Sequence, residues 1–206
     1  MPNEGALHFV KASLNRLDGE YDKALRSWDR LERLDPAARV VASYNRARIY
    51  AYKGDNERAL QELNYGAEVE PNHPLIRIFR ARILFYNGEP EKAARLMREV
   101  LTENPHLEGM RLILALMLAS ENKPAEARGQ ITERALQMAE ADFDMAYWAA
   151  SAFALLGEKD TAFEWLERAI TLGNENTGWF ERDKNLASLR ADSRYQTLMQ
   201  RIENNK

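Results

Sequence analysis

The 206-residue sequence contains no cysteine, which excludes disulfide bonds, thiol catalysis and cysteine-ligated zinc. Its three histidines, His8, His73 and His106, share no short metal-ligand spacing. Acidic residues are scattered along the chain. Pairs such as Asp55 and Glu57 flank expected helix starts, where carboxylates interact favourably with the helix dipole, so we do not expect them to act as a general acid and base. We therefore expect no enzyme activity, no metal and no cofactor.

A strong excess of charge is also lacking, because 29 lysines and arginines face 32 aspartates and glutamates, for a net charge of -3. This balance argues against nucleic-acid binding. The longest apolar run, Leu112 to Ala119, is much shorter than the roughly 20 residues of a membrane span. The first residues, Met1 to Gly5, lack the basic and apolar regions of a signal peptide. We expect a cytoplasmic location, with the periplasm as the alternative for part of a membrane-anchored sensor.

Three residue series recur along the chain with successive spacings of 35, 34, 34 and 35. The first series is Ala12, Ala47, Ala81, Ala115 and Ala150. The second is Ala24, Ala59, Ala93, Ala127 and Ala162, and the third is Gly19, Gly54, Gly88, Asn122 and Gly157. A fixed period near 34 is typical of stacked helical hairpins.

Each period predicts a helix, a turn, a second helix and a second turn. The glycine series suits the left-handed backbone at the end of the first helix, and Asn122 is the usual substitute there. Small residues allow the two helices to cross closely. Larger residues then fill the space between units, namely Leu31, Leu63, Met97, Ile131 and Leu166. The second helix of a unit ends at a proline, namely Pro36, Pro71 or Pro105.

These residues at these offsets resemble the tetratricopeptide repeat (TPR). The resemblance predicts an all-α fold, a right-handed α-solenoid of about five hairpins, with units at residues 5–38, 40–73, 74–107, 108–142 and 143–176. The fourth unit lacks the glycine and the closing proline and has Arg134 where a small residue is usual, so we expect a one-residue slip near Arg134 and Ala135. Residues 177–206 are expected to cap the solenoid, with Asp192 as the N-cap of a helix whose apolar stripe is Tyr195, Leu198, Met199 and Ile202.

The end of the chain resembles the C-terminal TPR regions of bacterial signalling proteins. The likeness is to repeats appended to serine/threonine protein kinases, and also to those of winged-helix regulators and adenylate cyclases. It is carried by residues 147–152, 157–158, 162–166, 174–176, 179–180, 189–190, 192–195 and 198–199. The resemblance implies a module excised from a larger protein, with a free-standing repeat protein as the alternative. No glycine-rich phosphate loop or catalytic Asp loop accompanies it, so no kinase activity is implied.

In the TPR family the first helix of each unit lines a concave groove. Carried over by position, the groove residues are Tyr44, Arg48 and Tyr52 in the second unit, Ile78, Arg82, Phe85 and Tyr86 in the third, Leu112 and Leu116 in the fourth, and Tyr147 and Ser151 in the fifth. Aromatic residues with paired arginines suit a peptide that carries an acidic group. In the alternative interpretation, both arginines are solvated or pair with nearby glutamates, and the aromatic residues pack between helices.

A second basic column, Lys11, Arg46 and Arg80, precedes the first alanine series by one residue. We expect its side chains at the edges between repeats, with buried stems and solvated heads. Some family members clamp a peptide carboxylate with a Lys/Asn set. Here Phe9 and Ser13 occupy two of those places and Asn45 alone matches, which argues against that mode of binding.

The leading hypothesis is a protein-interaction scaffold that binds a protein or peptide in its groove, as the docking or sensory module of a bacterial signalling protein. One alternative is a self-association module, because the apolar face of the 5–17 helix is left open at the N-terminal end and would support a homo-oligomer. A small-ligand sensing domain is the other.

Overall fold

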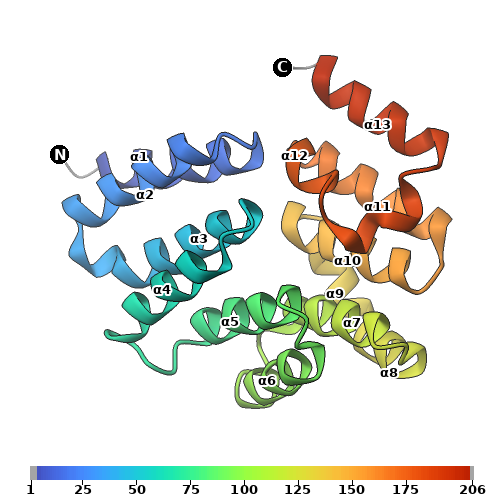
Figure 1. Cartoon of the computed structure of the whole chain (residues 1–206), viewed down its shortest axis with the longest axis horizontal. Helices are drawn as coiled ribbons and strands as arrows, with labels where there is room; N and C mark the ends of the chain where they lie inside the picture. Colours follow the sequence, from blue (N-terminus) through green and yellow to red (C-terminus); the bar gives the residue numbers. More distant parts are fainter. Residues whose placement is uncertain (1–3, 205–206) are drawn as a thin grey trace. The chain divides into compact units, whose positions relative to one another are not determined.

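The computed structural model describes residues 4–204, most of which lie in helices and none in a β-strand. This confirms the all-α prediction. The elements, labelled in Figure 1, are α1 (Glu4–Leu17), α2 (Tyr21–Leu34), η1 (Pro36–Ala38), α3 (Arg39–Tyr52), α4 (Asn56–Ala67), α5 (Pro74–Tyr86), α6 (Pro90–Glu103), η2 (Glu108–Met110), α7 (Arg111–Ser120), α8 (Pro124–Gln130), α9 (Glu133–Ala139), α10 (Phe143–Leu155), α11 (Lys159–Thr171), α12 (Thr177–Phe180), η3 (Lys184–Leu189) and α13 (Ser193–Asn204).

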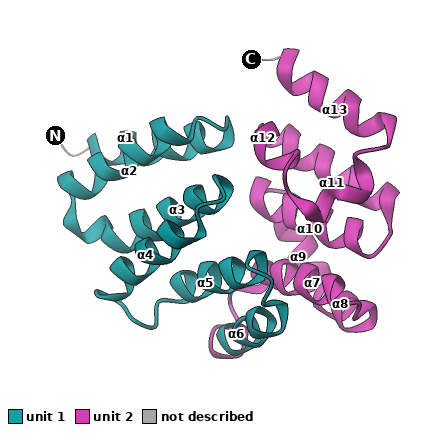
Figure 2. Ribbon diagram, in the orientation of Figure 1, with its two compact units in different colours: residues 1–100 teal, residues 101–206 magenta. Residues whose placement is uncertain are grey.

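The chain divides into two compact units, residues 1–100 and 101–206 (Figure 2). In the first, α1 packs on α2, α2 on α3 and α3 on α4. In the second, α7 packs on α8, α7 on α10 and α10 on α11. Within both units, helices adjacent in sequence form antiparallel hairpins (Figure 1).

The period of the sequence corresponds to the buried core. All ten alanines of the two series lie in helices and have no exposed surface. Each residue of the turn series has a positive φ, including Asn122 at 58° in the place that glycine takes elsewhere. The prediction that Asn122 replaces the turn glycine is therefore confirmed.

One glycine outside the turns marks a close helix approach. A Cβ on Gly66 of α4 would lie 2.8 Å from Ile76 Cδ1 and 2.9 Å from Ser43 Cβ. Side chains of α3 and α5 thus reach the backbone of α4 where it has no side chain. As at the alanine positions, a larger side chain would overpack the contact between helices, and at Gly66 even a Cβ atom would be too close to its neighbours.

The second helix of the fourth hairpin differs from expectation. It breaks into α8 and α9 at Ile131 and Thr132. Beyond the break, Ala135 rather than Arg134 is fully buried, 34 residues before the buried Ala169, as the expected one-residue slip requires. The Thr132 hydroxyl oxygen accepts the Ala135 N–H at 3.1 Å and so caps α9, while the hydroxyl donates to Glu108 Oε1 at 2.7 Å. Ile131 lies in the break and is partly exposed, whereas Leu31, Leu63, Met97 and Leu166 are buried.

The C-terminal segment continues the period in an irregular form. α12 and η3 occupy the place of a sixth first helix, and η3 packs on α10. α13 takes the place of a sixth second helix and packs on α11. Two ion pairs repeat the 34-residue offset, Arg194–Asp160 and Arg201–Glu167, each at 2.7 Å. α13 buries the predicted stripe, and the Asp192 carboxylate accepts the Arg194 N–H at 3.0 Å, as an N-cap does.

Candidate functional site

The predicted groove residues of the first unit share one face of two neighbouring helices. Tyr44, Arg48 and Tyr52 stand four residues apart on α3, which brings their side chains to one side of the helix. Ile78, Arg82 and Tyr86 repeat this arrangement on α5, and Phe85 lies beside Tyr86 with ring centres 5.2 Å apart. The structure therefore places the two sets on α3 and α5, which pack together.

The two arginines converge on a third aromatic ring. The guanidinium carbons of Arg48 and Arg82 lie 5.8 and 5.2 Å from the ring centre of Phe79. Arg48 Nε also donates to the Tyr52 hydroxyl at 2.8 Å. These distances are those of cation–π contacts, in which the ring face attracts the cation. Phe79 was not among the predicted residues, although it lies one turn before Arg82 on α5.

This cluster is tightly packed. The cavity that Arg48, Tyr52, Phe79, Arg82 and Tyr86 line has a volume of about 10 Å³, which is roughly the space of one water molecule. Arg48 and Arg82 are each only 7% exposed, so the interpretation that they are solvated is wrong.

The aromatic residues of the cluster pack between helices. Tyr44 is stacked on Phe79 with ring centres 5.5 Å apart and planes 4° apart, and burial raises the pKa of Tyr44. Tyr52 and Phe85 are buried, and Ile78 is fully so. A role of this face in binding a peptide stays a prediction.

In the second unit the predicted groove residues belong to the core. Leu112 and Leu116 on α7, and Tyr147 and Ser151 on α10, are all buried. The Tyr147 ring stacks on Phe180 of α12 at 5.1 Å, its hydroxyl donates to Asp183, and the Ser151 hydroxyl donates to the Tyr147 carbonyl at 3.0 Å. The C-terminal segment thus covers this face of α10.

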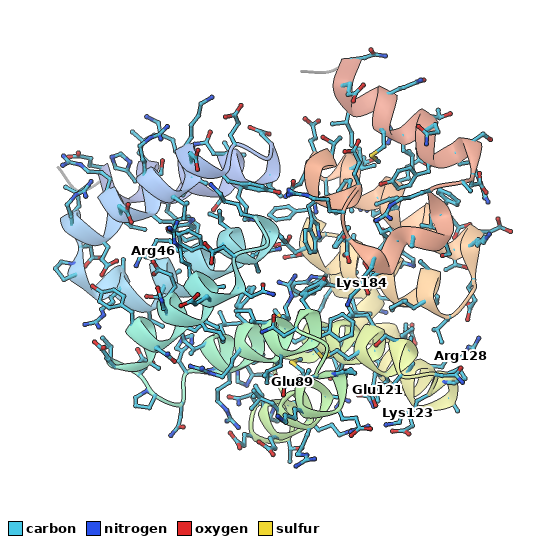
Figure 3. All side chains as sticks on the ribbon, viewed as in Figure 1. Arg46, Glu89, Glu121, Lys123, Arg128 and Lys184 are labelled. Carbon is cyan, nitrogen blue, oxygen red and sulfur yellow. The ribbon has the colours of Figure 1, made fainter. Side chains whose placement is uncertain are left out.

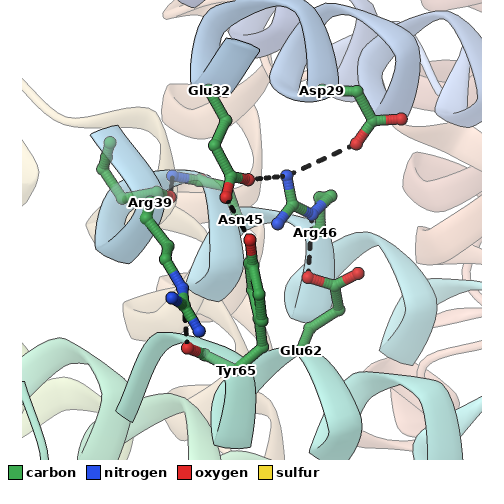
Figure 4. A network of polar contacts seen from close by, with 8 residues as sticks. Asp29, Glu32, Arg39, Asn45, Arg46, Glu62 and Tyr65 are labelled. Atoms are coloured by element: carbon green, nitrogen blue, oxygen red, sulfur yellow. Dashed lines mark hydrogen bonds and ion pairs between the residues drawn. The ribbon is translucent and has the colours of Figure 1, made fainter. Parts of the chain in front are cut away.

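A larger concavity lies between α2 and α4, with α3 at its floor. Its volume is about 850 Å³. Arg46, which is labelled in Figure 3, is one of its lining residues. It belongs to the second basic column, for which a solvated head was expected. Instead Arg46 is 5% exposed, and its guanidinium donates to Glu32 and Glu62 at 2.8 Å and to Asp29 at 3.3 Å (Figure 4). That expectation is wrong because acids on both neighbouring second helices reach it.

Within this cluster, burial and the ion pairs have opposite effects on the pKa values of Arg46 and Glu62. Burial lowers the pKa of Arg46, but the hydrogen bonds and charges of Glu62 and Glu32 outweigh burial and raise it. Burial raises the pKa of Glu62, and Arg46 offsets this only in part. The ion pairs of the cluster join α2, α3 and α4. A sequence signal existed, namely an arginine beside the alanine series with acids 14 and 17 residues before it and 16 after it.

A further polar pair extends the same surface. The Arg39 guanidinium carbon lies 3.7 Å from the ring centre of Tyr65, and Arg39 also pairs with Glu68. The Tyr65 hydroxyl donates to Glu32 at 2.7 Å and so joins this pair to the Arg46 cluster. In residues 4–204 there is no group of histidine and carboxylate side chains that could hold a metal ion, and no helix there is long and apolar enough to cross a membrane.

The comparison with family models decides the family. A tetratricopeptide repeat model matches residues 44–108, 80–143 and 112–177, which together span more than half of the chain. The chain belongs to the tetratricopeptide repeat family. The matches include the fourth hairpin, whose second helix is broken. The comparison with curated proteins finds no match.

Solved TPR structures are similar at low identity. Two crystal structures of MamA are 15% and 16% identical, cover 86% and 81% of this chain and 96% of their own, and have TM-scores of 0.44 and 0.45. YrrB, described as a TPR protein with an unusual peptide-binding site, is 20% identical over 84% of this chain and 88% of its own, with a TM-score of 0.42. At these values the likenesses carry no argument about function.

Proposed function

We propose that this TPR protein is an interaction scaffold that binds a peptide with an acidic group at the α3–α5 face of its first unit. The supporting observation is the convergence of Arg48 and Arg82 on Phe79 from equivalent positions of adjacent first helices. A guanidinium offers a planar pair of donors that matches a carboxylate. A small metabolite is disfavoured at this face, since the cavity of about 10 Å³ is too small to hold one.

Binding requires the Arg48 and Tyr52 side chains to turn outward. Their mutual hydrogen bond would be exchanged for bonds to the ligand. Such rotamer changes at an interface are common, and the backbone of TPR hairpins need not move. The aromatic rings would then contact the peptide, and the two arginines would bind its acidic group.

Selection from a displayed library of random 12-residue peptides tests this function. We expect enrichment of peptides that contain Asp or Glu. Binding of a selected peptide, measured by calorimetry, should weaken at least tenfold in the double variant Arg48→Gln plus Arg82→Gln, since a charged hydrogen bond is worth roughly 1.5–3 kcal/mol. Circular dichroism would show that the variant is folded.

The matched control changes two exposed arginines, Arg33→Gln plus Arg58→Gln, with the same loss of charge. It should retain the affinity within about twofold, because exposed charges contribute little. Peptides without acidic residues, or equal losses in both double variants, would contradict the assignment of the α3–α5 face.

We further propose that the scaffold serves as a docking or sensory module of a bacterial signalling protein. The support is the resemblance of residues 147–199 to the C-terminal repeats of such proteins. The reading frame and its neighbours provide the test. A kinase, cyclase or winged-helix domain encoded there supports the role, and an environment without any regulatory gene contradicts it.

A further inference from the structure

The outer face of α1 carries a concentration of exposed apolar side chains. Leu7, Phe9, Val10 and Leu14 are each 44–54% exposed. Leu7, Val10 and Leu14 recur at intervals of three and four residues, so they form one stripe along the helix. Beside the stripe is a groove of about 700 Å³ that is lined mainly by apolar residues of α1, the end of α2, and the start of α3. Exposed patches of this kind mark interaction sites.

The repeat register assigns a role to this stripe. One period later, the positions of Leu7 and Leu14 are occupied by Ala42 and Ile49, which are fully buried in a cluster with Trp28 and Leu31 of the preceding helix α2. A further period on, Ile76, Phe79 and Ile83 are buried in a cluster with Ala59 and Leu63 of α4. In both later repeats the positions of Leu7 and Leu14 therefore belong to the surface against which the second helix of the preceding hairpin packs. The Val10 position is the buried Phe79 in the third repeat and the partly exposed Asn45 in the second.

The charges at these junctions follow the same register. Arg46 donates to Asp29, five residues after Ala24 in α2, at 3.3 Å. Arg80 donates to Asn64, five residues after Ala59 in α4, at 2.9 Å. Lys11 occupies the equivalent position on α1 and is exposed. Lys11 is thus the equivalent of the two arginines that, at the later junctions, donate to an acid or an amide of the preceding helix.

The helices α11 and α13 differ at corresponding positions. On α11, Ala162, Leu166 and Ala169 are fully buried. The positions 34 residues later on α13 are Gln196, Gln200 and Glu203, all polar and exposed. A second copy stacked head to tail would bury this polar face against the apolar stripe of α1, and unsatisfied amides are unfavourable there. The occupant of the α1 face is therefore not a stacked copy.

We infer that the α1 face, defined by Leu7, Val10, Lys11 and Leu14, is a docking site for an amphipathic helix of a partner protein. The required pattern is set by α2: a small residue, large apolar residues four and seven positions later, and acids five and eight positions later. In α2 these residues are Ala24, Trp28, Leu31, Asp29 and Glu32. The partner helix would pack on α1 as α2 packs on α3. This site is separate from the α3–α5 face and does not rest on the proposed function.

A labelled peptide with the sequence of residues 20–35 is the probe, since it carries the full pattern. We expect saturable binding to the whole protein by fluorescence anisotropy, with a gain of peptide helicity in circular dichroism. The double variant Val10→Glu plus Leu14→Glu should weaken binding at least tenfold, because it places two charges in the apolar contact. The control Val69→Glu changes an exposed valine outside the face and should leave binding within twofold.

A charge exchange tests the register. Lys11→Glu should weaken binding of the peptide about two- to fivefold, as expected for an exposed ion pair. The peptide with Asp29→Lys should recover that loss on the Lys11→Glu protein and bind the wild type more weakly. A structural effect of Lys11→Glu would not produce this exchange.

Three results would overturn the inference. One is the absence of peptide binding at millimolar concentration to a folded protein. Another is binding that the α1 double variant does not weaken, which places the peptide elsewhere. The third is a concentration-dependent dimer in sedimentation that the same double variant dissociates, because a second copy would then be the occupant.

Discussion

The Arg46 cluster makes a strong prediction about stability. Replacing Arg46 by Met keeps most of the side-chain volume and removes the guanidinium that joins Asp29, Glu32 and Glu62. Two of these acids have side chains that are only 16% and 22% exposed, so they would remain desolvated without their counter-ion. Asp29 is half exposed and would be rehydrated.

The magnitude follows from this difference in exposure. Removing one partner of a buried ion pair destabilises a protein by roughly 3–5 kcal/mol. Because one of the three acids returns to water and the other two are partly solvated, we expect a loss of about 2–4 kcal/mol for Arg46→Met at neutral pH. Arg58→Met is the matched control, since the Arg58–Asp55 pair lies in the same surface but is exposed, and its loss should be below about 0.5 kcal/mol.

The pH dependence has a definite sign. The pKa of Glu62 is raised in the folded protein, chiefly by burial, so its carboxylate destabilises the fold above that pKa and protonation relieves the penalty. Arg46 lowers this pKa in the wild type, and the variant loses that effect. The difference in stability between Arg46→Met and the wild type should therefore shrink as the pH falls from 7 toward 5.

Urea unfolding followed by fluorine NMR of 5-fluorotryptophan measures the difference in stability between Arg46→Met and the wild type for the first unit alone. Trp28 lies in the first unit and the other three tryptophans in the second, so their resonances report the two units separately. The Trp28 transition should shift in Arg46→Met, most strongly at pH 7. A loss below about 1 kcal/mol, no dependence on pH, or an equal loss in Arg58→Met would refute the reasoning.

Three further predictions concern single residues. Gly66→Ala should destabilise the protein by about 1–3 kcal/mol in urea unfolding because its Cβ would overlap side chains of α3 and α5, whereas Gly129→Ala, with open space around its Cβ, should be neutral or stabilising. Asn122→Ala should lower stability by roughly 1–2 kcal/mol in the same assay because of its positive φ, and Asn122→Gly should not. The Arg194 guanidinium holds the pKa of Asp192 at about 2. In Arg194→Gln, a carbon NMR titration should therefore find the pKa of Asp192 raised toward 3.8. An unchanged pKa would assign the effect to the backbone N–H of residue 194 instead.

Local rules were enough to predict the repeat and its turns from sequence. An alanine at a helix crossing and Asn122 at a positive φ each depend on a few neighbouring atoms, and such requirements recur with every period. The break at Thr132 was missed because its second hydrogen bond goes to Glu108, 24 residues earlier. Sequence periodicity carries no information about a contact that occurs in only one unit.

The sequence was enough to predict which residues share the α3–α5 face, but not how deeply they are buried. Family positions placed Arg48 and Arg82 on one face, and the structure brings them to the same ring. The ring is that of Phe79, which was not among the residues predicted from the family positions. Tyr147 was assigned to the groove by the same pattern, yet its hydroxyl donates to Asp183, 36 residues later in a segment without a regular repeat.

Salt dependence separates the two proposed surfaces. On the α1 face, each of Leu7, Val10 and Leu14 contributes roughly 1.5–3 kcal/mol when fully buried, whereas the exposed Lys11 pair contributes at most about 1 kcal/mol. Binding there should be nearly independent of ionic strength. At the α3–α5 face, Arg48 and Arg82 would supply most of the specificity, and raising the salt concentration shortens the range of their attraction for an approaching acidic peptide. An acidic ligand whose affinity falls steeply with salt therefore belongs to the α3–α5 face, and a helical ligand insensitive to salt belongs to α1.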